Sequence, residues 1–131
     1  MYQKEKDYKV NFIRWILGRL ILGCDFLTRR KPVSRDTKSQ ALIDARTANL
    51  TMYQFEACPF CVKVRRAIRK QALKIELRDA RNEPVYKQEL ISGGGRYKVP
   101  CLKIKSDAGE ITWLYESGEI LSYLKREFKF T

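Results

Sequence analysis

The chain has 131 residues, of which 44% are hydrophobic and 32% charged, and its formal net charge is +12. This composition is typical of one folded domain with an appendage, and it excludes a disordered or collagen-like chain. The four cysteines are too few and too unevenly spaced for the disulfide framework of a small secreted protein, which favours a reducing, cytoplasmic compartment. Because there is no histidine, a zinc site would need all four cysteines, and we expect no metal.

The positive charge is spread along the chain. Residues 1–48 contain eleven Lys and Arg against five Asp and Glu, and residues 49–131 contain sixteen against ten. Such a surface favours anionic partners, including phospholipid headgroups, nucleic acid and glutathione, without choosing among them. We expect no specific nucleic-acid binding.

The first helix is predicted over residues 10–28, around an apolar run at 12–27 that is interrupted by Arg14, Arg19 and Asp25. A membrane-spanning helix needs about 20 mostly apolar residues. Two central arginines would cost about 5–7 kcal/mol on insertion, against about 3–6 kcal/mol returned by the apolar side chains. A transmembrane helix is therefore disfavoured, and the same arginines argue against a signal peptide or lipoprotein signal.

At 100° per residue this helix has one broad apolar face, with Arg14, Gly18 and Asp25 opposite it. The apolar face consists of Ile13, Ile16, Leu17, Leu20, Cys24 and Leu27. Lysines 4, 6 and 9 precede the helix and residues 29–31 continue the positive charge, as in helices that lie on an anionic membrane. Two interpretations stay open: peripheral contact with the inner face of the membrane, or packing on the domain or on a second copy.

Residues 28–48 are polar, contain Pro32, and are predicted to be a linker that ends in a helical turn over 39–46. We place the boundary near Ala48, so that residues 1–48 form a basic N-terminal extension and residues 49–131 the folded domain.

The domain is predicted to begin with a strand at 50–55, a helix from Pro59 to about Leu73, a strand at 75–78 and a helix at 83–91. A loop at Ser92–Gly95, strands at 99–105 and 111–115 joined by a turn around 107–109, and a final helix with Ser117 as its N-cap complete the list. The order βαβαββα predicts an α/β fold of the thioredoxin-like class, a mixed four-stranded sheet flanked by helices.

A C-x-x-C pair, Cys58-Pro59-Phe60-Cys61, follows the first strand and opens the first helix of the domain. At a helix N-terminus the unpaired N–H groups and the dipole favour an anion, so Cys58 is expected to attack disulfides as a thiolate. Cys61, one turn later, is placed to resolve the mixed disulfide. Two other interpretations are a static disulfide and a pair of buried thiols, but the position after a strand favours redox chemistry.

The motifs CPFC, Lys98-Val99-Pro100 and Tyr115-Glu116-Ser117 occur in an order that resembles glutaredoxins and the N-terminal domain of CPFC-containing glutathione S-transferases. The resemblance covers residues 49–131. It implies a glutathione-dependent thiol–disulfide oxidoreductase that takes part in electron transport, with Cys58 and Cys61 as the catalytic pair. It also implies that glutathione is the co-substrate and that disulfides or glutathionylated molecules are the substrates.

The resemblance further implies a glutathione site that consists of Pro59, Phe60, Lys98, Val99, Pro100, Glu116 and Ser117. Pro100 would follow a cis peptide bond, Val99 would pair with the cysteinyl backbone, and Glu116 with Ser117 would hold the γ-glutamyl end. Lys98 would bind the glycyl carboxylate, with Arg96 as a second candidate.

Three departures from the family leave other functions open. Phe55 stands where many glutaredoxins have a lysine, Cys101 directly follows the expected cis-proline, and we expect no separate helical domain of the kind that a full transferase has. The alternatives are a non-catalytic glutathione-binding redox sensor or docking module, and an iron–sulfur cluster carrier with Cys58 and glutathione as ligands.

Overall fold

The computed structural model describes the backbone of residues 2–29 and 31–130, and the side chains of residues 11–29 and 31–130. In chain order the elements are α1 (Tyr2–Leu27), α2 (Thr37–Thr47), β1 (Leu50–Gln54), α3 (Pro59–Lys70), β2 (Glu76–Asp79), α4 (Pro84–Glu89), the π-helical turn η1 (Leu90–Gly94), β3 (Cys101–Lys105), β4 (Ile111–Tyr115) and α5 (Ser117–Phe128). The side chains of Lys4, Lys6, Lys9 and Arg30, which the sequence places around the first helix, lie outside this description.

The four strands form one mixed sheet in the order β2-β1-β3-β4. β1 runs parallel to β2, with Met52 opposite Leu77, and antiparallel to β3, with Met52 opposite Leu102. β3 and β4 form the expected antiparallel hairpin. The predicted thioredoxin-like fold is therefore confirmed.

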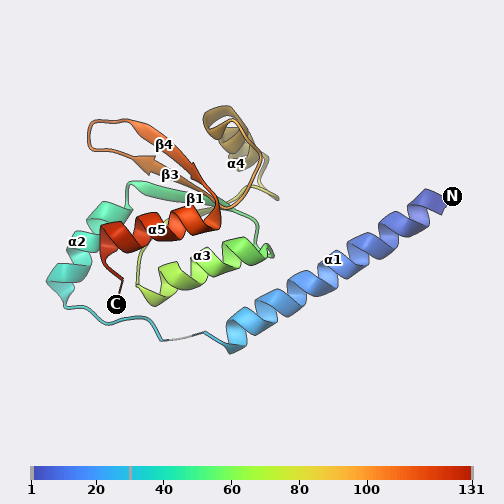
Figure 1. Cartoon of the computed structure of the whole chain (residues 1–131), viewed down its shortest axis with the longest axis horizontal. Coiled ribbons are helices and arrows are strands. Elements are labelled where there is room, and N and C mark those ends of the chain that lie inside the picture. Colours follow the sequence, from blue (N-terminus) through green and yellow to red (C-terminus); the bar gives the residue numbers. More distant parts are fainter. Residues whose placement is uncertain (1, 30, 131) are drawn as a thin grey trace.

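The two faces of the sheet are covered by different helices (Figure 1). Alternation along β1 sends Leu50 and Met52 toward α3 and α5, and Tyr53 toward α4 and η1. The larger core lies on the first side and comprises Leu50, Met52, Val64, Ile68, Leu73, Ile75, Leu102, Ile120, Leu124 and Phe128. Both faces of the sheet are therefore packed.

The prediction of a loop at Ser92–Gly95 is wrong for most of this segment, because α4 continues into the π-helical turn η1. Its glycines lie against aromatic side chains of β4: a Cβ on Gly93 would come within 2.1 Å of Trp113, and one on Gly94 within 2.0 Å of Tyr115. Gly95, with φ of 83°, ends the turn. Gly93 and Gly94 therefore allow the helical turn to pack closely against the aromatic side chains of β4.

Three predicted boundaries also shift. α3 ends at Lys70, and the chain then reverses through Ala72, whose φ is 52°. β3 begins only at Cys101, after the Val99–Pro100 bond. Ser117 is the first residue of α5 and not its cap, because Glu116 occupies the cap position with φ of 74°.

The segment predicted as a linker is packed on the domain. Asp36 caps α2, whose residues span the expected helical turn. The Val33 N–H donates to the Lys70 carbonyl at 2.8 Å, and Gln40 Nε2 donates to the Ala72 carbonyl at 2.9 Å. The side chain of Ile43 packs on the main core. The helical turn predicted over 39–46 is therefore confirmed within α2, and the segment before it, predicted as a linker, packs on the end of α3.

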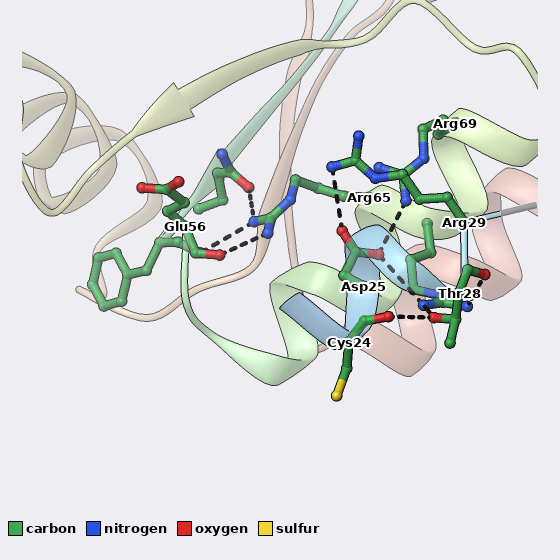
Figure 2. Close-up of polar contacts among 10 residues, drawn as sticks. Cys24, Asp25, Thr28, Arg29, Glu56, Arg65 and Arg69 are labelled. Carbon is green, nitrogen blue, oxygen red and sulfur yellow. Dashed lines mark hydrogen bonds and ion pairs between the residues drawn. The ribbon is translucent and has the colours of Figure 1, made fainter. Parts of the chain in front are cut away.

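The first helix, α1, is longer than predicted and extends away from the domain (Figure 1). It contacts α3 through its polar side, where Asp25 is only 3% exposed. The Asp25 carboxylate pairs with Arg69 at 3.0 Å, Arg66 at 3.4 Å and Arg29 at 3.6 Å (Figure 2). Within the part of the chain that the structure describes, no helix is long and apolar enough to cross a membrane.

Candidate functional site

The C-x-x-C pair lies where β1 passes into α3. Cys58 is the N-cap of α3, with extended backbone angles and a half-buried side chain, and Pro59 is the first helical residue. Cys61 lies one turn into the helix and is fully buried. Both are free thiols. The placement therefore exposes one thiol of the pair to a substrate and shields the other.

Burial raises the pKa of the Cys61 thiol to about 12, and the neighbouring Cys58 thiol adds to the effect. Cys61 is consequently protonated at neutral pH. Cys58 instead lies at the N-cap of α3, and its side chain makes no cap hydrogen bond. The geometry separates an accessible thiol from a protonated partner thiol one turn below it.

Arg65 holds the loop between β1 and Cys58 in place (Figure 2). Its guanidinium donates to the side-chain oxygen of Gln54, to the Phe55 carbonyl at 3.2 Å and to the Glu56 carbonyl at 2.6 Å. The spacing of four residues from Cys61 places Arg65 on the same helix face, and this is the signal that could have predicted the contact.

The Val99–Pro100 peptide bond is cis, as predicted. The following residue, Cys101, lies opposite Tyr53 of β1 and Tyr115 of β4. Pro100, the Cys58 loop and Glu116 are therefore at the same edge of the sheet. Cys101 itself is buried, and burial raises the pKa of its thiol to about 11.

The residues expected at the two ends of glutathione contact each other. Lys98 Nζ lies 2.6 Å from Glu116 Oε1, and this hydrogen bond lowers the pKa of the Glu116 carboxyl. Ser117 is half-buried at the start of α5, and Phe60 is 61% exposed beside Cys58. An exposed ion pair of this kind is weak and exchanges readily with a charged ligand.

The sequence did not identify Tyr115 as a positioning residue. Its hydroxyl donates to the Arg96 carbonyl at 2.9 Å and accepts from the Arg96 N–H at 3.3 Å. The Arg96 guanidinium lies 4.6 Å from the Tyr115 ring centre. Tyr115 thus fixes the backbone at Arg96, two residues before Lys98.

Comparison with known families finds one match, within the folded domain. Residues 50–108 match the family model described as glutaredoxin. The glutaredoxin match covers less than half of the 131 residues and includes Cys58, Cys61 and the cis-proline, but not Glu116, Ser117 or α1. No curated protein and no solved structure matches the chain. The match supports the glutaredoxin part of the resemblance, and the transferase part stays a prediction.

The described residues contain no group of three or more Cys, Asp or Glu side chains that could hold a metal ion. Cys24 is exposed on α1, whereas Cys61 in α3 and Cys101 in β3 are buried. Within residues 50–108, Cys58 is therefore the accessible thiol.

Proposed function

We propose that the protein is a glutathione-dependent thiol–disulfide oxidoreductase. The Cys58 thiolate attacks one sulfur of a disulfide, and a mixed disulfide with Cys58 forms as the other sulfur leaves as a thiolate. The Cys61 thiol then attacks the Cys58 sulfur, and its proton passes to the leaving sulfur, which departs as the second thiol. Two glutathione molecules reduce the Cys58–Cys61 disulfide and leave as glutathione disulfide, so two electrons pass from glutathione to the substrate.

The observation that carries this proposal is the asymmetry of the two thiols. Cys58 is half-exposed at a helix N-terminus, whereas Cys61 is buried with a raised pKa. A structural disulfide or two buried core thiols would not need one accessible sulfur beside an open helix end. The proposed glutathione site lies on the side of Lys98, Val99 and Glu116, where the segment fixed by Tyr115 meets the start of α5.

The test is the reduction of a small glutathione mixed disulfide by glutathione, with a redox titration alongside. We expect Cys58→Ser to lose nearly all activity. Cys61→Ser should still reduce glutathione mixed disulfides, because glutathione can resolve Cys58, but should lose activity on dithiol protein disulfides. The potential of the pair is expected at about −200 to −230 mV.

Two outcomes would contradict the proposal. Wild-type protein that binds glutathione but reduces no disulfide would be a sensor or docking module. A coloured protein after purification without oxygen, whose absorbance is lost in Cys58→Ser, would be an iron–sulfur carrier.

The proposal includes peripheral contact with an anionic membrane through α1. This helix turns its polar side, with Gly18 and Asp25, toward the domain, and leaves Ile13, Leu17 and Leu20 more than half exposed on the opposite side. A surface helix normally buries its apolar side. The net charge of +12 favours an anionic lipid surface over a second, equally charged copy of the chain.

Sedimentation with vesicles tests this contact. The protein should bind phosphatidylglycerol vesicles, bind phosphatidylcholine vesicles weakly, and dissociate as salt is added. Leu17→Glu and Leu20→Glu should abolish binding, whereas Leu42→Glu in α2, at a residue that is 64% exposed, should not. A stable dimer without lipid that Leu20→Glu dissociates would assign the apolar face to a second copy instead.

A further inference from the structure

A groove of about 340 Å³ lies between α1 and the loop that precedes Cys58. α1 contributes Arg14, Trp15 and Arg19, the loop contributes Glu56, and the turn after β2 contributes Arg81. The helix comes so close to the loop that a Cβ on Gly18 would lie 2.9 Å from the Cβ of Ala57, the residue before Cys58. One wall of the groove therefore belongs to the glutaredoxin region and the other to the N-terminal helix outside it.

The strand order places this groove on one particular side of Cys58. β1 has β2 on one side and β3 on the other. Arg81 follows β2, while the cis-proline Pro100 precedes β3. The proposed glutathione residues lie on the β3 side, so the groove is a separate surface on the β2 side of the same sulfur.

The groove is positively charged, and its arginines are available to an acidic ligand. Among the described residues, Arg14, Arg19 and Arg81 form no ion pair with a carboxylate, and the lining holds one acidic side chain, Glu56. The Arg19 guanidinium lies 5.5 Å from the Trp15 ring centre. An arginine stacked on an aromatic ring keeps its edge N–H groups free for a carboxylate.

We propose that this groove binds an acidic segment of a protein substrate, next to the oxidised cysteine that Cys58 attacks. This inference rests on the proposed redox function and names the class of its substrate. The groove is small for a ligand pocket, which typically measures about 300–1,000 Å³, so it suits a few side chains of a peptide segment. A glutathionylated substrate would then be bound through its glutathione on the β3 side of Cys58 and through its own carboxylates on the β2 side.

The test compares two glutathionylated peptides that differ only in the residues flanking the cysteine, Asp and Glu in one and Asn and Gln in the other. Wild-type protein should show a kcat/KM about tenfold higher for the acidic peptide, because three exposed charge pairs act together although each is weak. The preference should decline as salt is added. The combined variant Arg14→Gln, Arg19→Gln and Arg81→Gln should bring the ratio of the two kcat/KM values to about one.

Arg126→Gln is the matched control, because Arg126 lies in the last turn of α5 and should leave the ratio unchanged. Arg19→Glu should favour a peptide with flanking lysines. Binding of the two peptides with serine in place of cysteine is measured in parallel. If the two kcat/KM values are equal in wild-type protein, or if their ratio is unchanged in the triple variant, the groove does not bind the acidic segment. If the protein prefers to bind the acidic peptide but reduces neither peptide, only the proposed redox function is contradicted.

Discussion

The helices α1 and α3 both approach the loop before Cys58, but α3 turns its apolar face toward the domain and α1 turns its polar face. α3 buries apolar residues such as Val64 and Ile68 in the core and turns Arg66 and Arg69 outward. α1 meets those arginines with a buried carboxylate, Asp25, and leaves its own apolar side uncovered. The pair shows that an amphipathic pattern predicts a helix with two chemically distinct faces, but does not say which face the domain uses.

The largest expected effect is a difference in the free energy of unfolding between an Ile→Ala variant in α3 and one in α1. Ile68→Ala in α3 should lower the free energy of unfolding by about 2–5 kcal/mol, because Ile68 is 6% exposed and a cavity would remain. Ile13→Ala in α1 should change it by no more than about 0.5 kcal/mol, because Ile13 is 55% exposed. Denaturant unfolding measures both. Equal losses would mean that the apolar face of α1 is covered within the monomer.

A second prediction concerns the loop that both helices approach. Arg65→Gln should remove the hydrogen bonds to two carbonyls and destabilise the protein by about 2 kcal/mol. Activity should fall about tenfold or more, mainly in kcat, because the position of Cys58 loosens. Lys63→Gln, an exposed substitution on the same helix, is the control. Unchanged activity in Arg65→Gln would show that Arg65 does not position the site.

The polar contact between the helices gives a third, smaller effect. Asp25→Asn should cost about 1–2 kcal/mol, because three arginines lose their common carboxylate, although solvent reaches all three. Hydrogen exchange should accelerate in α1 and remain unchanged in β1. Glu127→Gln, which removes the exposed pair with Arg46, should change neither. If exchange in α1 does not accelerate, the ion-pair cluster is not what holds the helix.

The effect expected to be smallest at neutral pH is a stability change within residues 50–108 that appears only above about pH 9. Burial raises the pKa of Cys101 from 9.0 to about 11, so the folded state holds this proton above pH 9 while the unfolded state releases it. Stability should therefore be full below about pH 9 and decline as pH rises toward 11, at up to about 1.4 kcal/mol per pH unit for one thiol. Cys101→Ala should make the curve shallower in this window. An unchanged slope would show that Cys101 ionises alike in both states.

The positions of the site residues followed from local patterns. CPFC after an apolar run predicted a cysteine at the start of a helix, and Cys58 is the N-cap of α3. The resemblance to glutaredoxins implied the cis bond before Pro100, and the structure has it. The helix start succeeds because short-range geometry decides it, whereas the cis bond was expected only from the resemblance. The roles of Lys98, Val99, Glu116 and Ser117 in binding glutathione stay predictions.

The failures occurred where distant residues decide the local structure. Ser92–Gly95 has the composition of a loop, yet the rings of Trp113 and Tyr115 hold it as a π-helical turn. The segment before α2 is polar enough for a linker, yet carbonyls at the end of α3 accept hydrogen bonds from Val33 and Arg35. Neither partner is close in sequence.

The sequence by itself determined the order of strands and helices, the thioredoxin-like class and the place of the cysteine pair, because hydrophobic periodicity, proline and helix-end chemistry act over a few residues. Only the tertiary structure decided which thiol is shielded, how Arg65 fixes the loop and which side of α1 faces the domain. These depend on burial and on pairings such as Asp25 with Arg69, 44 residues apart, that no local pattern contains.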